Sequence, residues 1–307
     1  MATRKKSTKK QEKLDALIFI DTNIFLDFYR IRRSDVSLDY LKSIGEHHEI
    51  IITGSQVEME YKKNRQKVIL ETIKGMKTLD WNSLSAPAIL ADAQPVQVLR
   101  KKKDEINKQH KTLKERVIKI LKNPAYNDPV YKTLQRLFKN KSSFNLKRED
   151  EKKYTIRELA QKRFLLGYPP RKKNDNSIGD AINWEWLIQC ANDSGKDIIL
   201  VTRDSDYGEI HDNQSFLNDW LFQEFKERVS KTRTIFITSR LAEAFKKISL
   251  TVTKEMEKEE ERIIKENKIL EVAEGSQEVE KLVQITLNKK NFFKMSLDEI
   301  LNSEKSF

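Results

Sequence analysis

The sequence predicts an α/β fold built on a central parallel β-sheet. Residues 16–20 form an uninterrupted apolar run of strand length, which indicates a strand buried on both faces. Helical patterns alternate with further short apolar runs, and the order strand, helix, strand, helix is typical of a parallel sheet. The first and third predicted strands end in aspartates, at the sheet edge where α/β proteins bind their ligands.

The N-terminal part contains the first two strands. Residues 1–13 are polar and rich in lysine, so we expect a basic disordered tail. After the first strand, the apolar spacing predicts a short helix that Ser34 can cap and Gly45 can end. Residues 49–53 are expected to form the second strand, and a helix begins near Gln56.

A long helical insertion is predicted at residues 66–166, within a domain that spans residues 14–250. Between Arg100 and Arg148 there are sixteen Lys or Arg and four Asp or Glu, a net charge of +12 that equals the charge of the whole chain. This stretch favours an anionic partner such as nucleic acid. The alternative is a solvated helical hairpin whose aromatic residues form its own core. The aromatic residues in question are Tyr126, Tyr131, Phe138 and Phe144.

The second half of the domain continues the alternation. A turn-rich basic loop, residues 167–176, leads to a helix. The remaining elements are expected as a helix over 178–192, a strand over 197–202, a helix over approximately 215–229, a strand over 234–238 and a helix from Leu241.

The remaining segment and the composition bound the class of protein. Residues 251–307 are rich in Lys and Glu with sparse apolar positions, which predicts a helical C-terminal extension that a protein partner or self-association covers. The mean hydropathy is −0.68, and neither a signal peptide nor a membrane span is predicted, so no membrane partner is expected. The single cysteine, Cys190, excludes an intrachain disulfide and a cysteine-cluster metal site, so we expect a cytoplasmic protein.

Acids far apart in the sequence are expected to meet at one edge of the sheet. Asp21 ends the first strand, and Asp204 follows the third, with Asp206 as a further candidate. Asp180 lies in the first turn of its helix, where the helix dipole alone would also favour an acid. Parallel strands carry the residues at their carboxyl ends to the same edge, so these carboxylates are predicted to share a small volume.

The helix after the second strand offers two acids. Glu58 fits a capping box with Ser55, which gives it a structural role. Glu60 shares a helix face with Val57 and Asn64 and can lean towards the sheet edge, so we select Glu60 as the fourth candidate.

Four carboxylates in one place indicate a divalent cation. Left unpaired, they would repel one another and destabilise the fold. Mg²⁺ or Mn²⁺ prefers carboxylate and water oxygens, whereas zinc prefers histidine or cysteine. None of the four histidines, His47, His48, His110 and His211, falls at these positions.

Four ordered motifs resemble those of the PIN domain nucleases. Residues 20–23 (Ile-Asp-Thr-Asn) resemble the first acidic motif of that family, and residues 57–65 resemble the second in a PIN-like subgroup with a long helical insertion. Residues 167–184 resemble the third motif of the subgroup, and residues 201–204 the fourth. The likeness spans about residues 17–245 and leaves the C-terminal extension outside.

The resemblance implies a three-layer α/β/α sandwich that cleaves single-stranded or structured RNA with Mg²⁺ or Mn²⁺ and leaves 5′-phosphate and 3′-hydroxyl ends. By that analogy the cation is held by Asp21, Glu60, Asp180 and Asp204, with Asp206 optional, and an activated water attacks the phosphate. Asn23 and Thr202 would support these ligands. Nucleic acid would be bound by Arg203, Asn64, Arg65, Arg171, Lys172, Lys173, Lys101, Lys102 and Lys103.

Two other interpretations stay open. A structure-specific DNA nuclease of the flap-endonuclease type shares the fold and the acidic cluster, and a catalytically silent nucleic-acid-binding or partner-binding module can be built on the same fold. Four acids that face phosphates argue against a purely binding module. An aspartyl-phosphate phosphatase would carry a second Asp where Asn23 stands, so that class is demoted. A role as a toxin or in antiviral defence follows from the family analogy alone.

Overall fold

The computed structural model describes residues 14–74, 88–90, 92–171, 177–212, 214–267 and 269. The chain divides into two compact units, Met1–Glu257 and Lys258–Phe307. The tail predicted for residues 1–13 and the extension beyond residue 269 lie outside the described residues, although residues 254–267 are helical. Among the helices that the structure describes, none combines the length and the apolar character that a membrane span requires.

A five-stranded parallel sheet forms the centre of the first unit, which confirms the predicted fold class. Its strand order is β3-β2-β1-β4-β7. The strands are β1 (Ala16–Ile20), β2 (Ile51–Gly54), β3 (Asn145–Leu146), β4 (Asp197–Val201) and β7 (Ile235–Thr238). Because β1 lies in the middle, its end faces the ends of β2 and β4 on either side.

The register of the central strands positions the sheet edge. All five residues of β1 are buried, as the uninterrupted apolar run predicts. Ile20 pairs with Val201, so the residues that follow, Asp21 and Thr202, leave the sheet at the same level. The apolar side chains of β1 and β4 therefore form the core, and the polar residues after them form the rim.

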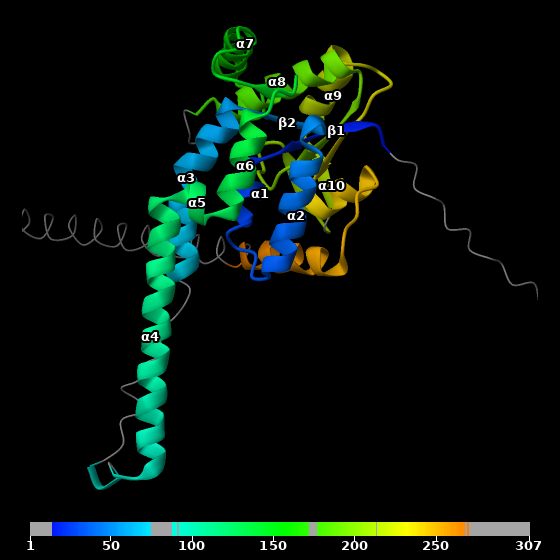
Figure 1. Cartoon of the computed structure of the whole chain (residues 1–307). Coiled ribbons are helices and arrows are strands. Elements are labelled where there is room, and N and C mark those ends of the chain that lie inside the picture. Colours follow the sequence, from blue (N-terminus) through cyan, green and yellow to red (C-terminus); the bar gives the residue numbers. More distant parts are fainter. Residues whose placement is uncertain are drawn as a thin grey trace, which may run out of the picture. The chain divides into compact units, whose positions relative to one another are not determined.

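Helices cover both faces of the sheet and make the three-layer α/β/α arrangement. Figure 1 shows α8 and α9 on one side of β1 and β2, and α2 and α10 on the other. The helices packed around the sheet are α1 (Thr22–Asp27), α2 (Ser34–Glu46), α3 (Ser55–Lys74), α7 (Lys152–Leu166), α8 (Gly179–Ser194), α9 (Asp219–Arg228) and α10 (Leu241–Lys247).

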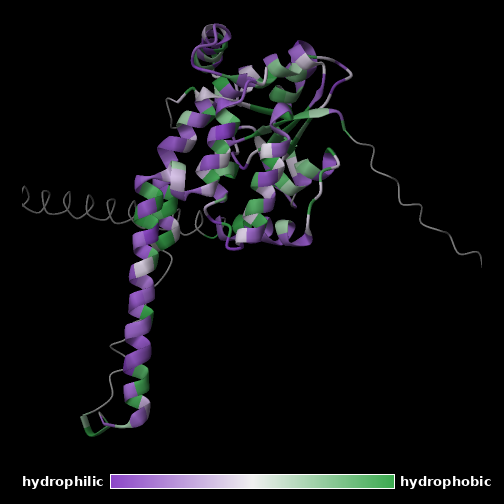
Figure 2. Cartoon of the chain, in the orientation of Figure 1, coloured by the Kyte–Doolittle hydropathy of each residue, from purple (hydrophilic) through white to green (hydrophobic). Residues whose placement is uncertain are grey.

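The insertion between α3 and α7 is mainly helical. It contains α4 (Gln94–Lys122), α5 (Pro124–Asn127) and α6 (Pro129–Lys139), and it also contributes the edge strand β3. All residues of α4 are described and none is buried. Figure 2 shows α4 as mostly hydrophilic, in contrast to the apolar strands. By contrast, α6 buries Val130, Leu134, Leu137 and Phe138 against the core.

Three local predictions differ from the structure. Residues 208–217, partly assigned to a helix from 215, form the antiparallel hairpin β5 (Gly208–His211) and β6 (Gln214–Leu217), and α9 begins at Asp219. A Cβ at Gly208 would lie 2.0 Å from the carbonyl oxygen of Phe216, so glycine permits this close pairing. Strand β3 was not predicted, because two residues carry no periodic pattern. Helix α2 continues through Gly45 to Glu46, so that glycine does not end the helix.

Candidate metal centre

Asp21 lies directly after β1 and caps the start of α1. Its backbone N–H donates to the carbonyl oxygen of Val201 at 2.9 Å, which ties it to the end of β4. Its carboxylate accepts three hydrogen bonds, from the backbone N–H of Thr22 at 2.6 Å, from Asn23 Nδ2 at 2.8 Å and from Thr202 Oγ1 at 2.5 Å. The carboxylate is therefore held in one orientation by groups from both central strands.

The environment of Asp21 raises its pKa from 3.8 to about 6. Burial of the carboxyl group is the largest cause, and the hydrogen bond from Thr202 opposes it. The negative charges of Asp204 and Glu60 raise the pKa further, whereas the bond from the Thr22 amide lowers it. Asp21 is thus electrostatically coupled to acids from the loop after β4 and from α3.

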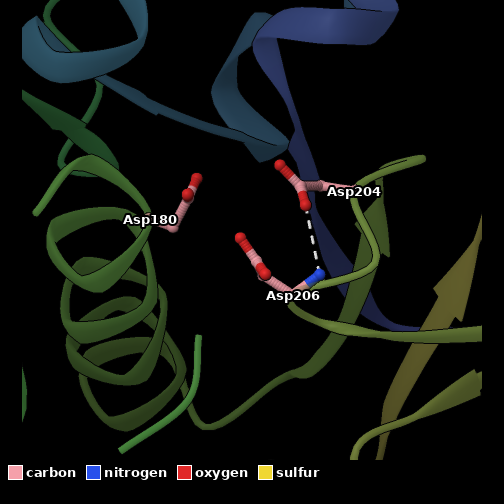
Figure 3. Close-up of side chains that lie close together, drawn as sticks. All are labelled: Asp180, Asp204 and Asp206. Atoms are coloured by element: carbon pink, nitrogen blue, oxygen red, sulfur yellow. Dashed lines mark hydrogen bonds between the residues drawn. The ribbon is translucent and has the colours of Figure 1, made fainter. Parts of the chain in front are cut away.

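Asp180, Asp204 and Asp206 form the tightest group of acids. Each offers a carboxylate oxygen, and these oxygens all lie within 4.8 Å of one another. Figure 3 shows Asp180 on its helix, opposite Asp204 and Asp206 on one loop, around a shared space. The backbone N–H of Asp206 donates to Asp204 Oδ1 at 3.1 Å, which shapes the loop. Asp206, an optional ligand in the sequence-based prediction, is therefore part of this group.

Glu60 projects from the second turn of α3 towards the start of α8. Its Oε2 accepts a hydrogen bond from Thr22 Oγ1 at 3.1 Å, and its Oε1 accepts one from Gln56 Nε2 at 2.6 Å. A Cβ at Gly179 would lie 2.3 Å from Glu60 Oε1, so glycine next to Asp180 allows the two helices to approach this closely. The other acid of this helix, Glu58, pairs with Lys62 at 2.6 Å.

Tyr207 is a buried residue beside the acids that the sequence did not predict. Its side chain is buried, and its hydroxyl donates to the backbone carbonyl oxygen of Asp180 at 3.2 Å. Burial is the largest cause that raises the pKa of Tyr207 well above its usual value. The charges of four acids raise it as well, namely Asp180, Asp21, Asp204 and Glu60. The charges of all four acids thus act on this one side chain. In the sequence, only its position one residue after Asp206 pointed to Tyr207.

The two supporting residues connect the acids to one another. Thr202 Oγ1 donates to Asp21 and accepts the backbone N–H of Asp204 at 3.0 Å. Asn23 Nδ2 bonds Asp21 and lies 3.4 Å from Thr202 Oγ1. These contacts place Thr202 and Asn23 between Asp21 and the backbone of Asp204.

The donor set suits a hard divalent cation. All of the candidate ligand atoms are carboxylate oxygens, which Mg²⁺ and Mn²⁺ prefer, and the buried Asp21 is easier to ionise beside a cation. The histidines that zinc would require lie elsewhere: His47 and His48 bond carbonyl oxygens at the end of α2, and His211 is an exposed residue of β5. His110 lies on α4.

Two of the arginines predicted to contact nucleic acid point into the protein. Arg65 is buried and donates to Asp128 Oδ2 at 2.6 and 3.0 Å, and this pair joins α3 to the insertion. Arg203 pairs with Asp27, and both side chains are largely buried. Arg65 therefore has a structural role, and Arg203 is held away from solvent, contrary to the expectation for both.

The other predicted nucleic-acid contacts are placed differently. Asn64 Nδ2 donates to the backbone carbonyl oxygen of Glu60 at 3.1 Å, so it braces α3. Arg171 is exposed and its guanidinium lies 4.6 Å from the ring centre of Phe164. Lys101 and Lys102 are exposed on α4, and Lys103 is partly exposed. Lys172 and Lys173 lie outside the described residues.

Most aromatic residues of the basic segment belong to the core. Phe138 packs edge-to-face on Phe25 with ring centroids 6.0 Å apart, and Phe144 packs against the same core. Tyr131 lies under the guanidinium of Arg65, 5.3 Å from it. Tyr126 is exposed. Three of the four aromatic residues thus pack into or against the core of the α/β domain rather than forming a separate core of the hairpin, and they do not offer base-stacking surfaces.

Comparison with known proteins gives one match. A family model described as PIN domain matches residues 18–207, which is more than half of the chain and includes every acid described above. Neither the curated proteins nor the solved structures contain a match. PIN domains are generally metal-dependent nucleases that act on nucleic acid.

Proposed function

The chain belongs to the PIN domain family, and from this premise we propose that it is an endoribonuclease that hydrolyses phosphodiester bonds with Mg²⁺ or Mn²⁺. Asp180, Asp204 and Asp206 would hold the cation together with Asp21 and Glu60, the other two acids of the rim. RNA is favoured over DNA by the motif resemblance to the PIN ribonucleases.

One observation carries this proposal, namely the convergence of five acids at one sheet edge. Three of them place oxygens within 4.8 Å of one another, and the charges of Asp204 and Glu60 act on the buried Asp21. Such a cluster costs folding energy through mutual repulsion. A bound divalent cation removes that cost, and a silent binding module would gain nothing from acids that repel phosphates.

The residues of the chain have separate tasks in this mechanism. A bound cation supplies Lewis acidity to the scissile phosphate and lowers the pKa of the attacking water. Thr202 and Asn23 hold the Asp21 carboxylate, and Thr202 also fixes the backbone of Asp204. Asp21 would be ionised in the cation-bound site, because a nearby cation would lower the pKa that burial raises in the metal-free protein. Hydrolysis leaves 5′-phosphate and 3′-hydroxyl ends, as the family analogy implies.

Positive charge for the nucleic-acid backbone comes from α4 and from the loop before α8. The exposed Lys101 and Lys102 lie on a helix in which no residue is buried, so their ammonium groups are accessible to phosphates. Arg171 is exposed in the loop that leads to Asp180. These cations neutralise phosphates without reading the sequence of bases.

The proposal is tested with labelled single- and double-stranded RNA and DNA, and with branched DNA, each incubated with Mg²⁺, Mn²⁺ or EDTA. We expect RNA cleavage that requires the cation and is lost in Asp204→Asn, while RNA binding is retained. Asp35→Asn is the control, because it makes the same change at an exposed aspartate that is paired with Arg33 on the surface. Cleavage of branched DNA alone would support the flap-type alternative, and binding without cleavage of any substrate would support the silent module.

We propose that the enzyme acts as a toxin or defence effector, on the basis of the family analogy, and that it acts in the cytoplasm, on the basis of its single cysteine. Induced expression of the wild-type chain should then arrest growth of the host cell, whereas Asp204→Asn should not. Normal growth under induction, with cleavage demonstrated in vitro, would contradict this setting and leave the chemistry untouched.

A further inference from the structure

The topology brings a second group of side chains to the edge where the acids lie. Helix α9 follows the loop at the carboxyl end of β4 and returns the chain to the start of β7, so its first residues lie at that edge. Helix α8 precedes β4 and also starts there, with the loop from α7 leading into it. The first residues of α9 therefore lie at the same edge of the sheet as the acids, and so does a residue that contacts them.

Tyr168 and Trp220 meet at this place. Their ring centroids are 5.0 Å apart and the ring planes are inclined by 47°. Both side chains remain open to solvent, with 38% and 45% of their surface exposed. Large aromatic residues that touch each other yet stay this exposed gain little for the core, so the pair is available to a ligand.

A buried ion network fixes the backbone beneath the pair. Arg163 donates to Glu185 Oε1 at 2.8 Å and also contacts Glu224 and the carbonyl oxygen of Pro169, next to Tyr168. Arg228 donates to Glu185 Oε2 at 2.7 Å. The network joins α7, α8 and α9. Ion pairs and hydrogen bonds therefore hold the two segments that carry the rings.

Hydrogen bonds connect the start of α9 to the acids. The backbone N–H of Asn218, two residues before Trp220, donates to the carbonyl oxygen of Tyr207 at 2.9 Å. The hydroxyl of the same Tyr207 donates to the carbonyl oxygen of Asp180 at 3.2 Å. Two hydrogen bonds and one side chain thus separate the start of α9 from the acidic group.

We propose that Tyr168 and Trp220 form a base-stacking subsite, in which an unpaired base beside the scissile phosphate lies against the exposed aromatic pair. The inference rests on the proposed nuclease function and names its substrate class as single-stranded nucleic acid. Every base has a π-face, so stacking selects for an unpaired strand without selecting a sequence. Bases in a duplex are already stacked and cannot reach the pair.

The adjoining charge favours a nucleic-acid strand over an apolar protein partner. Arg171 follows Tyr168 by three residues, and its guanidinium lies over the ring of Phe164 on an exposed residue, where it can still meet a phosphate. A nucleic-acid strand could run from Arg171 past the aromatic pair to the acids. One phosphate would then contact the arginine, one base would stack on the aromatic pair, and the scissile phosphate would lie at the acids. An apolar docking patch would not require a cation at its border.

The test measures binding in EDTA, so that it does not depend on catalysis. Single-stranded RNA and DNA oligonucleotides carry 2-aminopurine at one position each, and their fluorescence is recorded on addition of the full-length chain. We expect quenching at one or two neighbouring positions. Trp220→Leu and Tyr168→Leu should each remove that quenching and weaken single-strand binding about 5- to 100-fold, with duplex binding unchanged. Trp220→Phe should retain most of the affinity.

Phe222→Leu is the matched control, because Phe222 lies on the same helix with 44% exposure but makes its ring contact with Lys226. It should bind like the wild type. The inference is overturned if no position is quenched in the wild type, or if Trp220→Leu binds single strands as the wild type does, as a protein-docking patch would. Quenching of the 2-aminopurine fluorescence without cleavage in Mg²⁺ or Mn²⁺ would contradict the nuclease proposal alone. Cleavage without quenching would contradict the stacking subsite alone.

Discussion

Thr202 Oγ1 donates a hydrogen bond of 2.5 Å to Asp21 Oδ2, and so links the ends of two adjacent central strands whose residues lie 181 positions apart. The same oxygen accepts the backbone N–H of Asp204. One hydroxyl group therefore orients two of the acids in the candidate metal centre.

The first prediction concerns this hydroxyl. Thr202→Val should raise the pKa of Asp21 further, because the bond from Thr202 is the largest contribution that lowers it. A lost hydrogen bond to a charged group costs about 1.5–3 kcal/mol, so the Mn²⁺ affinity measured by calorimetry at pH 6 should fall by about tenfold or more. Thr238→Val is the control, since Thr238 is also buried at a strand end but bonds Glu243. Equal Mn²⁺ affinity for the wild type and Thr202→Val would contradict the orienting role.

The second prediction concerns pH. In the metal-free protein the pKa of Asp21 is about 6 against 3.8 for the ordinary group, so the folded state binds the proton more tightly than the unfolded state. The contribution of Asp21 to stability is therefore fully present below pH 3.8 and is lost as the pH rises through 6, by roughly 3 kcal/mol. Cation affinity should change in the opposite direction and increase as the pH rises to just above 6, because the cation competes with the proton.

Urea unfolding of the metal-free chain and Mn²⁺ titration, each between pH 4 and pH 8, measure the two trends. Asp21→Asn has no titrating group at this position. Its stability and its Mn²⁺ affinity should therefore lack the part of the pH dependence that Asp21 contributes. A Mn²⁺ affinity that does not change between pH 5 and pH 7 in the wild type would speak against a protonated Asp21 in the metal-free site.

The third prediction concerns the helix approach at Gly179. In Gly179→Ala the new Cβ would lie 2.3 Å from Glu60 Oε1 and 2.7 Å from Gln56 Nε2, so the start of α8 or Glu60 has to move. We expect cleavage to fall by tenfold or more, while overpacking destabilises the fold by about 1–3 kcal/mol. Gly45→Ala is the control: no atom lies within 4 Å of its Cβ, and alanine in a helix should stabilise by about 0.5–1 kcal/mol without a change in cleavage. Full cleavage activity in Gly179→Ala would contradict a role for Glu60 in the site.

The fourth prediction concerns the basic helix α4. Reversal of two exposed charges, Lys101→Glu with Lys102→Glu, should weaken RNA binding and flatten the dependence of log affinity on log salt concentration, because fewer phosphate counterions are released. The control reverses the exposed Lys42 on α2 and the exposed Lys231 in the loop after α9. If both double variants show the wild-type salt dependence, the charge of α4 serves only to solvate the helix.

Local sequence patterns predicted those parts of the fold that depend on neighbours along the chain. The apolar run over residues 16–20 becomes the fully buried β1, whereas the short helix α1, which Asp21 caps, was not among the predicted elements. Hairpin β5–β6 was missed, because residues such as Gln214 and Ser215 give it no buried face and hence no apolar alternation. The close approach that Gly208 permits becomes visible only when Phe216 is placed opposite it.

The candidate site shows the same division. The parallel arrangement of the strands predicts that acids of distant motifs converge. Which acids form the tightest group depends on the loop conformation. The sequence therefore did not predict that Asp206 belongs to this group or that Tyr207 lies beside it. The burial of Arg65 depends on Asp128, 63 residues further along the chain. No local pattern distinguishes an arginine that a distant carboxylate will bury from one that remains on the surface.

The most direct test of the account is a Mn²⁺ titration of the purified chain by calorimetry, with the wild type, Asp180→Asn and Asp204→Asn measured side by side under conditions in which thermal unfolding shows that all three are folded. The account predicts a saturable Mn²⁺ site in the wild type that each substitution weakens by at least tenfold, in parallel with the loss of RNA cleavage. A wild type that binds no Mn²⁺ or Mg²⁺, or variants that bind and cut as the wild type does, would contradict it.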